Sequence, residues 1–100
     1  MPVLFNMLHR YDLQTGQVDE WFAGPTCTFQ DPVFLPRAAD AREGEGYLAA
    51  IVNDIPRRRS EVVILNALAL ADGPIARIRI PVCLRMGIHA SWFDAARFAK

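Results

Sequence analysis

Two side chains in this sequence have the types and neighbours that metal chemistry requires. His89 lies within the segment Gly-Ile-His-Ala-Ser-Trp at 87–92, where small flanking residues would let a bulky centre approach the backbone. Asp31 precedes Pro32, which keeps the backbone before it extended and so aims the carboxylate. His89 is therefore a candidate metal ligand. The alternatives are a packed histidine whose ring needs only a hydrogen bond, and an aspartate that forms a surface turn.

The other reactive side chains favour structural roles. His9 lies on the alternating face of an N-terminal strand, beside aromatic residues. Cys27 and Cys83 are far apart and belong to no Cys-x-x-Cys motif, so we interpret both as structural thiols. The arginine run 57–59 could contact a phosphate or an anionic partner, but a run this short in a hairpin loop is usually solvated.

The composition is that of one small globular domain. The chain has 100 residues, of which 52% are hydrophobic and 22% are charged. Its 11 basic and 11 acidic side chains give zero net charge, so no long-range field attracts nucleic acid or an acidic membrane. The N-terminus lacks the basic start and apolar core of a signal peptide, and no apolar run approaches the roughly 18 residues of a membrane span. A cytoplasmic, reducing setting is expected.

Alternating apolar and polar residues predict a hairpin near the N-terminus. The alternation covers 3–11, a turn with Gly16 at positive φ follows, and 18–22 forms the return strand. The segment 26–37 is predicted to be extended, and 38–46 is predicted to be a polar loop.

The second half of the chain predicts a core hairpin. The segments 47–52 and 61–66 are apolar on both faces, as expected for interior strands. The segment 67–71 is long enough for a single helical turn and is followed by the breakers Asp-Gly-Pro.

The segment 75–80 alternates between apolar and basic residues, which predicts a further strand. Its arginines, Arg77 and Arg79, are predicted to face water, and its apolar side chains to face inward. The side chains predicted to face inward are Ala76, Ile78 and Ile80. The tail 91–100 is interpreted as a short helix.

Short antiparallel strands joined by Gly, Pro and Asp turns, with little helix, indicate an all-β fold. A sandwich, a barrel and a piece of a propeller all fit this pattern, and spacing alone does not separate them.

A set of short motifs, spread in order over nearly the whole chain, together resembles one known family. The motifs are Tyr-Asp-Leu-x-Thr-Gly at 11–16, Ala-Gly-Pro at 23–25, Phe-Gln-Asp-Pro-Val-Phe-x-Pro-Arg at 29–37, Glu-Gly-Tyr-Leu at 45–48, Ser-Glu-Val-Val-Ile-Leu-Asn-Ala at 60–67, Leu-Ala-x-Gly-Pro-Ile-Ala at 70–76 and Gly-Ile-His-Ala-Ser-Trp at 87–92. The ordered set resembles the C-terminal end of the carotenoid cleavage oxygenase family, most of all its bacterial lignostilbene dioxygenase-like branch.

The resemblance implies a seven-bladed β-propeller in which four histidines on the central axis hold ferrous iron, Fe(2+), and three acids hydrogen-bond to three of those histidines. With dioxygen, members of this family split an alkene into two carbonyl products. His89 matches the last of the four iron ligands, and Asp31 matches the acid of the family's Glu-Pro-x-Phe-Val motif, which orients a ligating histidine. This sequence departs from the family in two places, since Asp31 is one methylene shorter than the usual Glu and Ala90 replaces the Gly that commonly follows the histidine.

The resemblance also implies that residues 1–100 are a single C-terminal fragment of such a propeller, about two blades in extent. The other three iron histidines belong to upstream blades, and His9 matches none of them. We therefore expect the fragment to be inactive alone and to bind ferrous iron weakly, because even open non-haem iron sites use three protein ligands. The full-length enzyme would act on a small apolar or phenolic alkene of lignostilbene or carotenoid type. The alternative is a non-catalytic β-sheet interaction module that has lost the reaction and self-associates through open sheet edges.

Overall fold

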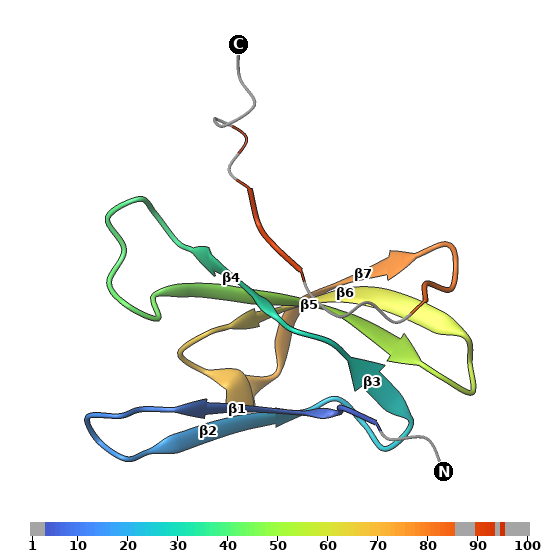
Figure 1. Ribbon diagram of the computed structural model, residues 1–100, viewed down its shortest axis with the longest axis horizontal. Coiled ribbons are helices and arrows are strands. Elements are labelled where there is room, and N and C mark those ends of the chain that lie inside the picture. Colours follow the sequence, from blue (N-terminus) through green and yellow to red (C-terminus); the bar gives the residue numbers. More distant parts are fainter. Residues whose placement is uncertain (1–3, 86–89, 94, 96–100) are drawn as a thin grey trace.

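The computed structural model describes residues 4–85, 90–93 and 95, and in that part of the chain antiparallel strands predominate (Figure 1). The strands are β1 Met7–Tyr11, β2 Val18–Phe22, β3 Cys27–Phe29, β4 Val33–Pro36, β5 Gly46–Asp54, β6 Arg59–Asn66 and β7 Pro74–Ile80, and a 3-10 turn, η1, covers Leu70–Asp72. The predicted all-β class with antiparallel hairpins is confirmed. The helix predicted in the tail 91–100 falls mostly outside the described residues.

The strands form two sheets that pack against each other. β1 and β2 make a separate hairpin, whereas the larger sheet has the order β3-β5-β6-β7, with β4 also pairing to β5. Figure 1 shows the β1–β2 hairpin lying along one side of the larger sheet. β5 is the central strand, because β3 and β4 occupy two parts of one of its edges and β6 occupies the other.

The N-terminal hairpin is confirmed, although β1 begins at Met7, later than the start of the predicted strand 3–11, and Asp12 fixes its turn. The Asp12 Oδ1 atom accepts hydrogen bonds from the backbone N–H groups of Thr15, at 3.1 Å, and Gln14, at 2.9 Å. These bonds favour the ionised form and lower the pKa of the Asp12 carboxyl from its usual value. Gly16 adopts the predicted positive φ, 74°, and so directs the chain back into β2.

The core hairpin is also confirmed, and it is longer than predicted. Its register runs from Tyr47 opposite Asn66 to Asp54 opposite Arg59, so both strands extend past the predicted segments 47–52 and 61–66. The residues added at the turn end of the hairpin, 53–54 and 59–60, are polar or charged. A prediction from apolar runs alone therefore makes the strands too short.

The single helical turn begins later than predicted, at Leu70 instead of 67. The Ala67 N–H donates to the Gly46 carbonyl oxygen at 3.0 Å and therefore prolongs the β5–β6 pairing. Asn66 then forms a local turn, in which its Oδ1 atom accepts from the Leu68 N–H at 3.0 Å.

Gly46 allows β4 to approach β5 closely. A Cβ atom at this buried position would lie 2.9 Å from both Phe34 Cζ and Pro36 Cα, and it would press into the Leu35 carbonyl oxygen. Any larger side chain would therefore separate the two strands, which accounts for the glycine in the motif at 45–48.

One apolar cluster between the hairpin and the larger sheet forms the core. It consists of Trp21 from β2, Phe29 from β3, Ala50 and Val52 from β5, Val63 and Leu65 from β6, and Leu70 from η1. The Trp21 and Phe29 rings stack with their centroids 5.8 Å apart. The core thus covers only the side of the sheet that the hairpin faces.

The direction predicted for the side chains of β7 is wrong, although their alternation is right. Arg77 lies opposite Val63, whose side chain is fully buried in the core, and Ile78 lies opposite Val62. Directly paired residues share one face of a sheet. The arginines therefore lie on the hairpin side, and Ile78 projects to the other side, where it is 53% exposed. Alternation fixes which residues share a face, but the packing of the hairpin decides which face is covered.

The side of the larger sheet away from the hairpin carries exposed or half-buried apolar side chains. We call this surface the open face; its apolar residues are Ala49, Ile51, Val62, Ile64, Ala76, Ile78 and Ile80. Ile51, in the middle of the central strand, is 44% exposed. The middle of the larger sheet therefore exposes apolar surface on the side away from the hairpin.

Asp19 joins the hairpin to η1 through hydrogen bonds, and its loss tests how far the packing of the hairpin depends on them. The Asp19 carboxylate accepts from the backbone N–H of Leu70 at 2.7 Å and of Ala71 at 3.1 Å. We expect Asp19→Ala to lower the free energy of unfolding by about 2 kcal/mol, because two N–H groups of η1 lose a charged acceptor. Urea denaturation measures this change.

The neighbouring Glu20→Ala is the matched control for that experiment. Glu20 is 59% exposed and, among the residues that the structure describes, its carboxylate pairs with His9 alone, so its loss is expected to cost less than about 1 kcal/mol. Equal losses in the two variants would contradict the connecting role of Asp19.

Candidate metal centre

Asp31 lies in a break between two strands that pair with the same edge of β5. Phe29, the last residue of β3, is opposite Val52, whereas Val33, the first residue of β4, is opposite Ala49. Residues 30–32 on one side therefore face only residues 50–51 on the other. This one-residue excess is a β-bulge.

The sequence itself produces the bulge. Pro32 has no N–H to donate to a ladder, and it holds Asp31 extended, so regular pairing cannot continue past Phe29. A bulge bends its strand and redirects the side chain at that point. The Asp31 side chain is exposed. An acid that orients a histidine from another segment must be accessible to that histidine, and exposure of Asp31 agrees with this requirement.

His89 lies outside the described residues, so the approach of the Asp31 carboxylate to the His89 ring stays a prediction. The structure does describe the segment that leads toward it. The backbone N–H of Leu84 donates to Ser60 Oγ at 2.9 Å, which attaches the chain after β7 to the start of β6.

Ser60 is a positioning residue that the sequence reasoning missed. Its hydroxyl donates to Asn53 Oδ1 at 2.6 Å while accepting from Leu84, and its side chain is fully buried. Asn53, directly opposite on β5, is 7% exposed. Buried polar atoms need hydrogen-bond partners, and here the Ser60 hydroxyl and the Asn53 amide oxygen are partners of each other. The sequence did contain a feature that could have indicated this pair: an asparagine directly follows the apolar run 47–52, and a serine directly precedes the apolar run 61–66.

The remaining candidate donors do not come together. His9 Nε2 lies 3.0 Å from Glu20 Oε2 on the hairpin, and its ring is 6.0 Å from that of Tyr11, which agrees with a structural role. Both cysteines are free, Cys27 half-buried and Cys83 exposed. Burial, and then the negative charges of nearby carboxylates, raise the pKa of the Cys27 thiol, so this thiol stays protonated at neutral pH and is a poor ligand.

A complete iron site does not fit within the described part of the chain. In residues 4–85, 90–93 and 95, no group of three or more His, Cys, Asp or Glu side chains could hold a metal ion. Ferrous iron in open non-haem sites has three protein ligands. One aspartate cannot supply this set, so a metal site that uses Asp31 needs ligands from other parts of a protein.

Removing the Ser60 hydroxyl tests whether it attaches the segment after β7. We expect Ser60→Ala to cost about 1–3 kcal/mol of unfolding free energy, because the buried Asn53 amide and the Leu84 N–H both lose their partner. The Leu84 amide should also exchange faster with deuterium.

Ser91→Ala removes the same hydroxyl from an exposed serine and provides the control. It should change stability by less than about 0.5 kcal/mol. Unchanged Leu84 exchange in Ser60→Ala would mean that other contacts hold this segment.

Comparison with known proteins identifies similar chains over nearly the whole sequence. The family model described as RPE65, retinal pigment epithelial membrane protein, matches residues 1–94. Lignostilbene-alpha,beta-dioxygenase isozyme III of Sphingomonas paucimobilis is 44% identical over 92 residues, covering 92% of this chain and 19% of that protein. Isoeugenol monooxygenase of Pseudomonas putida is 39% identical over 88 residues, covering 88% of this chain and 18% of that enzyme.

Solved structures agree with these relatives. The lignostilbene dioxygenase of Pseudomonas brassicacearum superimposes with a TM-score of 0.85 at 49% identity, covering 90% of this chain and 19% of that one. A variant of the Synechocystis apocarotenoid oxygenase gives a TM-score of 0.83 at 25% identity, with 91% and 19% covered.

The chain thus spans about a fifth of the length of these relatives. Within the residues that the structure describes, no helix has the length and apolar character that crossing a bilayer requires.

Proposed function

The chain belongs to the RPE65 and carotenoid cleavage oxygenase family, and we propose that it forms the C-terminal part of a non-haem iron(II)-dependent dioxygenase that cleaves an alkene into two carbonyl products. The observation that carries the proposal is the 49% identity to a lignostilbene dioxygenase over 90% of the chain, with the same backbone arrangement. The resemblance read from the motifs is confirmed by these matches, and so is the fold as part of a carotenoid oxygenase propeller.

The substrate proposed is a small alkene joined to a phenol ring. Relatives named for lignostilbene, resveratrol and isoeugenol are 44%, 48% and 39% identical, whereas one named for carotenoid cleavage is 32% identical. An apolar alkene of carotenoid type is the second choice. Dioxygen is the other substrate.

In this proposal His89 is one of four histidines that hold ferrous iron, and the other three come from the rest of the protein. Asp31 accepts the N–H of a ligating imidazole, which fixes the tautomer and raises the basicity of the ligand. The bulge at 30–32 supports this role, because it leaves Asp31 outside the strand pairing on either side of it. The metal, when bound, supplies the site for dioxygen chemistry.

The fragment itself is proposed to comprise about two blades and to be inactive alone. The two sheets support this division, since each pairs its own strands. A cytoplasmic location is part of the proposal and is supported by two free cysteines, which a reducing compartment preserves.

The second candidate function is a non-catalytic interaction module that self-associates. The observation in its favour is the open face, where Ile51 of β5 is 44% exposed and Ile78 of the edge strand β7 is 53% exposed. In a whole enzyme a neighbouring blade would cover this face. In an isolated chain a second copy would have to do so.

The deciding experiment uses the protein encoded by the longest reading frame that contains this chain. We expect His89→Ala to abolish cleavage of a hydroxystilbene and to lower the bound iron, whereas Asp31→Asn lowers activity about 10- to 100-fold. Aldehyde products are measured by chromatography and iron by atomic absorption.

His9→Ala is the matched control, because that histidine lies on the hairpin beside Tyr11 and pairs with an exposed glutamate, and activity should stay within about twofold. Full activity and full iron in His89→Ala would refute the proposal. A reading frame without three further histidines would favour the interaction module, and sedimentation of the chain as a dimer would then support it.

A further inference from the structure

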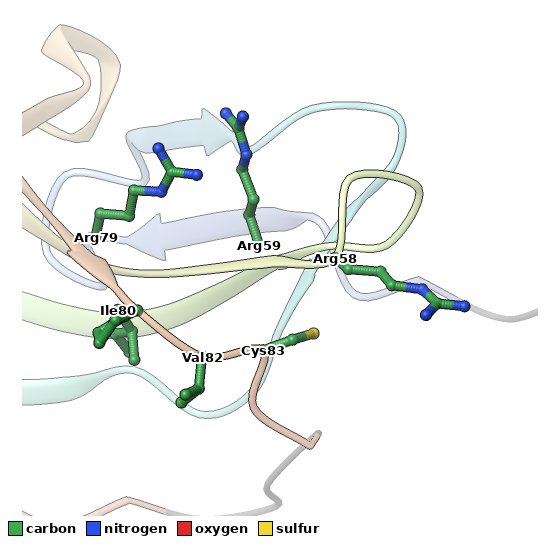
Figure 2. Close-up of a pocket in the computed structure, with 7 residues that line it drawn as sticks. Arg58, Arg59, Arg79, Ile80, Val82 and Cys83 are labelled. Carbon is green, nitrogen blue, oxygen red and sulfur yellow. The ribbon is translucent and has the colours of Figure 1, made fainter.

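We infer that the chain carries a separate binding site for a small oxyanion, a phosphate or a carboxylate, where β6 and β7 lie beside the β5–β6 turn. A cavity of about 370 Å³ is lined there by Arg58, Arg59 and Arg79, and by the segment 80–83 that leaves β7 (Figure 2). This volume lies within the range of small-ligand pockets. The site does not rest on the proposed dioxygenase function.

Two of the arginines are placed by the sheet to act together. Glu61 lies opposite Arg79, and Arg59 is two residues before Glu61 on β6, so both arginines are on one face of the sheet. Figure 2 shows their guanidinium groups projecting to the same side, while Ile80 and Val82 point to the other side. Two adjacent strands therefore present a pair of cations.

Arg58 completes the basic lining from the hairpin turn. It is the last turn residue before β6, has a positive φ of 51°, and its N–H donates to the Ile55 carbonyl oxygen at 3.2 Å. The turn geometry requires this left-handed backbone, which is uncommon for a residue with a side chain. Its side chain leaves the turn in a different direction from the other two (Figure 2).

The two carboxylates directly opposite these arginines in the register, Glu61 opposite Arg79 and Asp54 opposite Arg59, pair with other arginines. Glu61 pairs with Arg77 at 3.7 Å, and Asp54 pairs with Arg57, also at 3.7 Å. Within the described part of the chain, no ion pair joins a carboxylate to the three arginines of the cavity. A bound anion would give these arginines an acceptor that the described carboxylates do not supply.

Guanidinium chemistry decides the class of ligand. The planar group presents paired N–H donors that match two oxygens of a carboxylate or a phosphate, and two such groups can hold one anion from two sides. The arginines are exposed, so water and salt weaken the attraction and affinity in the millimolar range is expected. The three arginines of the run at 57–59 therefore differ: Arg57 pairs with Asp54, whereas Arg58 and Arg59 line the cavity.

The test is an NMR titration of the chain with inorganic phosphate and with acetate, at constant ionic strength set by chloride. Saturable shifts are expected for the backbone amides of the lining residues other than Pro81, which has no N–H: Arg58, Arg59, Arg79, Ile80, Val82 and Cys83. Arg59→Gln and Arg79→Gln should each weaken binding about fivefold or more, because each removes one guanidinium fork. The anion that binds more tightly identifies the preferred oxygen geometry.

Arg42→Gln removes an equal charge from an exposed arginine in the loop before β5 and serves as the control. Its affinity should match that of the unchanged chain. If a glutamine variant loses the dispersed spectrum of a folded chain, Arg79→Lys replaces it, since lysine keeps the charge but lacks the fork. Shifts that do not saturate, or an equal loss of affinity in Arg42→Gln, would overturn the inference.

Discussion

The stacking of Trp21 on Phe29 is the contact on which the rest of the structure depends. It joins two sheets that share no paired strands, and it lies within the apolar cluster that β5 and β6 complete. Phe29 is also the last residue before the bulge at 30–32. The core therefore fixes the point from which the Asp31 carboxylate leaves the sheet, so burial and the candidate site are coupled through adjacent residues.

The same core leaves the chain incomplete on its other side. Apolar residues on both faces of β5 and β6 would be costly in a stand-alone domain, and the hairpin covers only one of those faces. A chain that spans about a fifth of its relatives explains this pattern, because neighbouring parts of a larger protein would cover the open face. In the proposed longer protein, the same neighbouring parts would also supply the other iron ligands.

Local patterns predicted the elements but not the contacts between them. Alternation and the turn at Gly16 located the N-terminal hairpin, and two continuous apolar runs located the core hairpin, because these patterns act over short distances. The direction of Ile78 was predicted wrongly and the Ser60–Asn53 pair was missed, because both depend on contacts between segments far apart in the sequence. The β1–β2 hairpin decides which face of β7 is covered, and the segment at Leu84 covers Ser60. The roles proposed for Asp31 and His89 come from the resemblance alone, and the register adds only that Asp31 lies in the break between β3 and β4.

The most direct measurement is the distance between the Asp31 carboxylate and the His89 ring in a crystal structure of the longer protein that contains this chain. If Asp31 orients the histidine, the heavy atoms should be roughly 2.7–3.2 Å apart, or about 5 Å apart with one bridging water. The shorter aspartate, in place of the usual glutamate, makes the bridged geometry equally acceptable. A separation beyond about 10 Å would contradict the orienting role and leave Asp31 as a surface residue of the bulge.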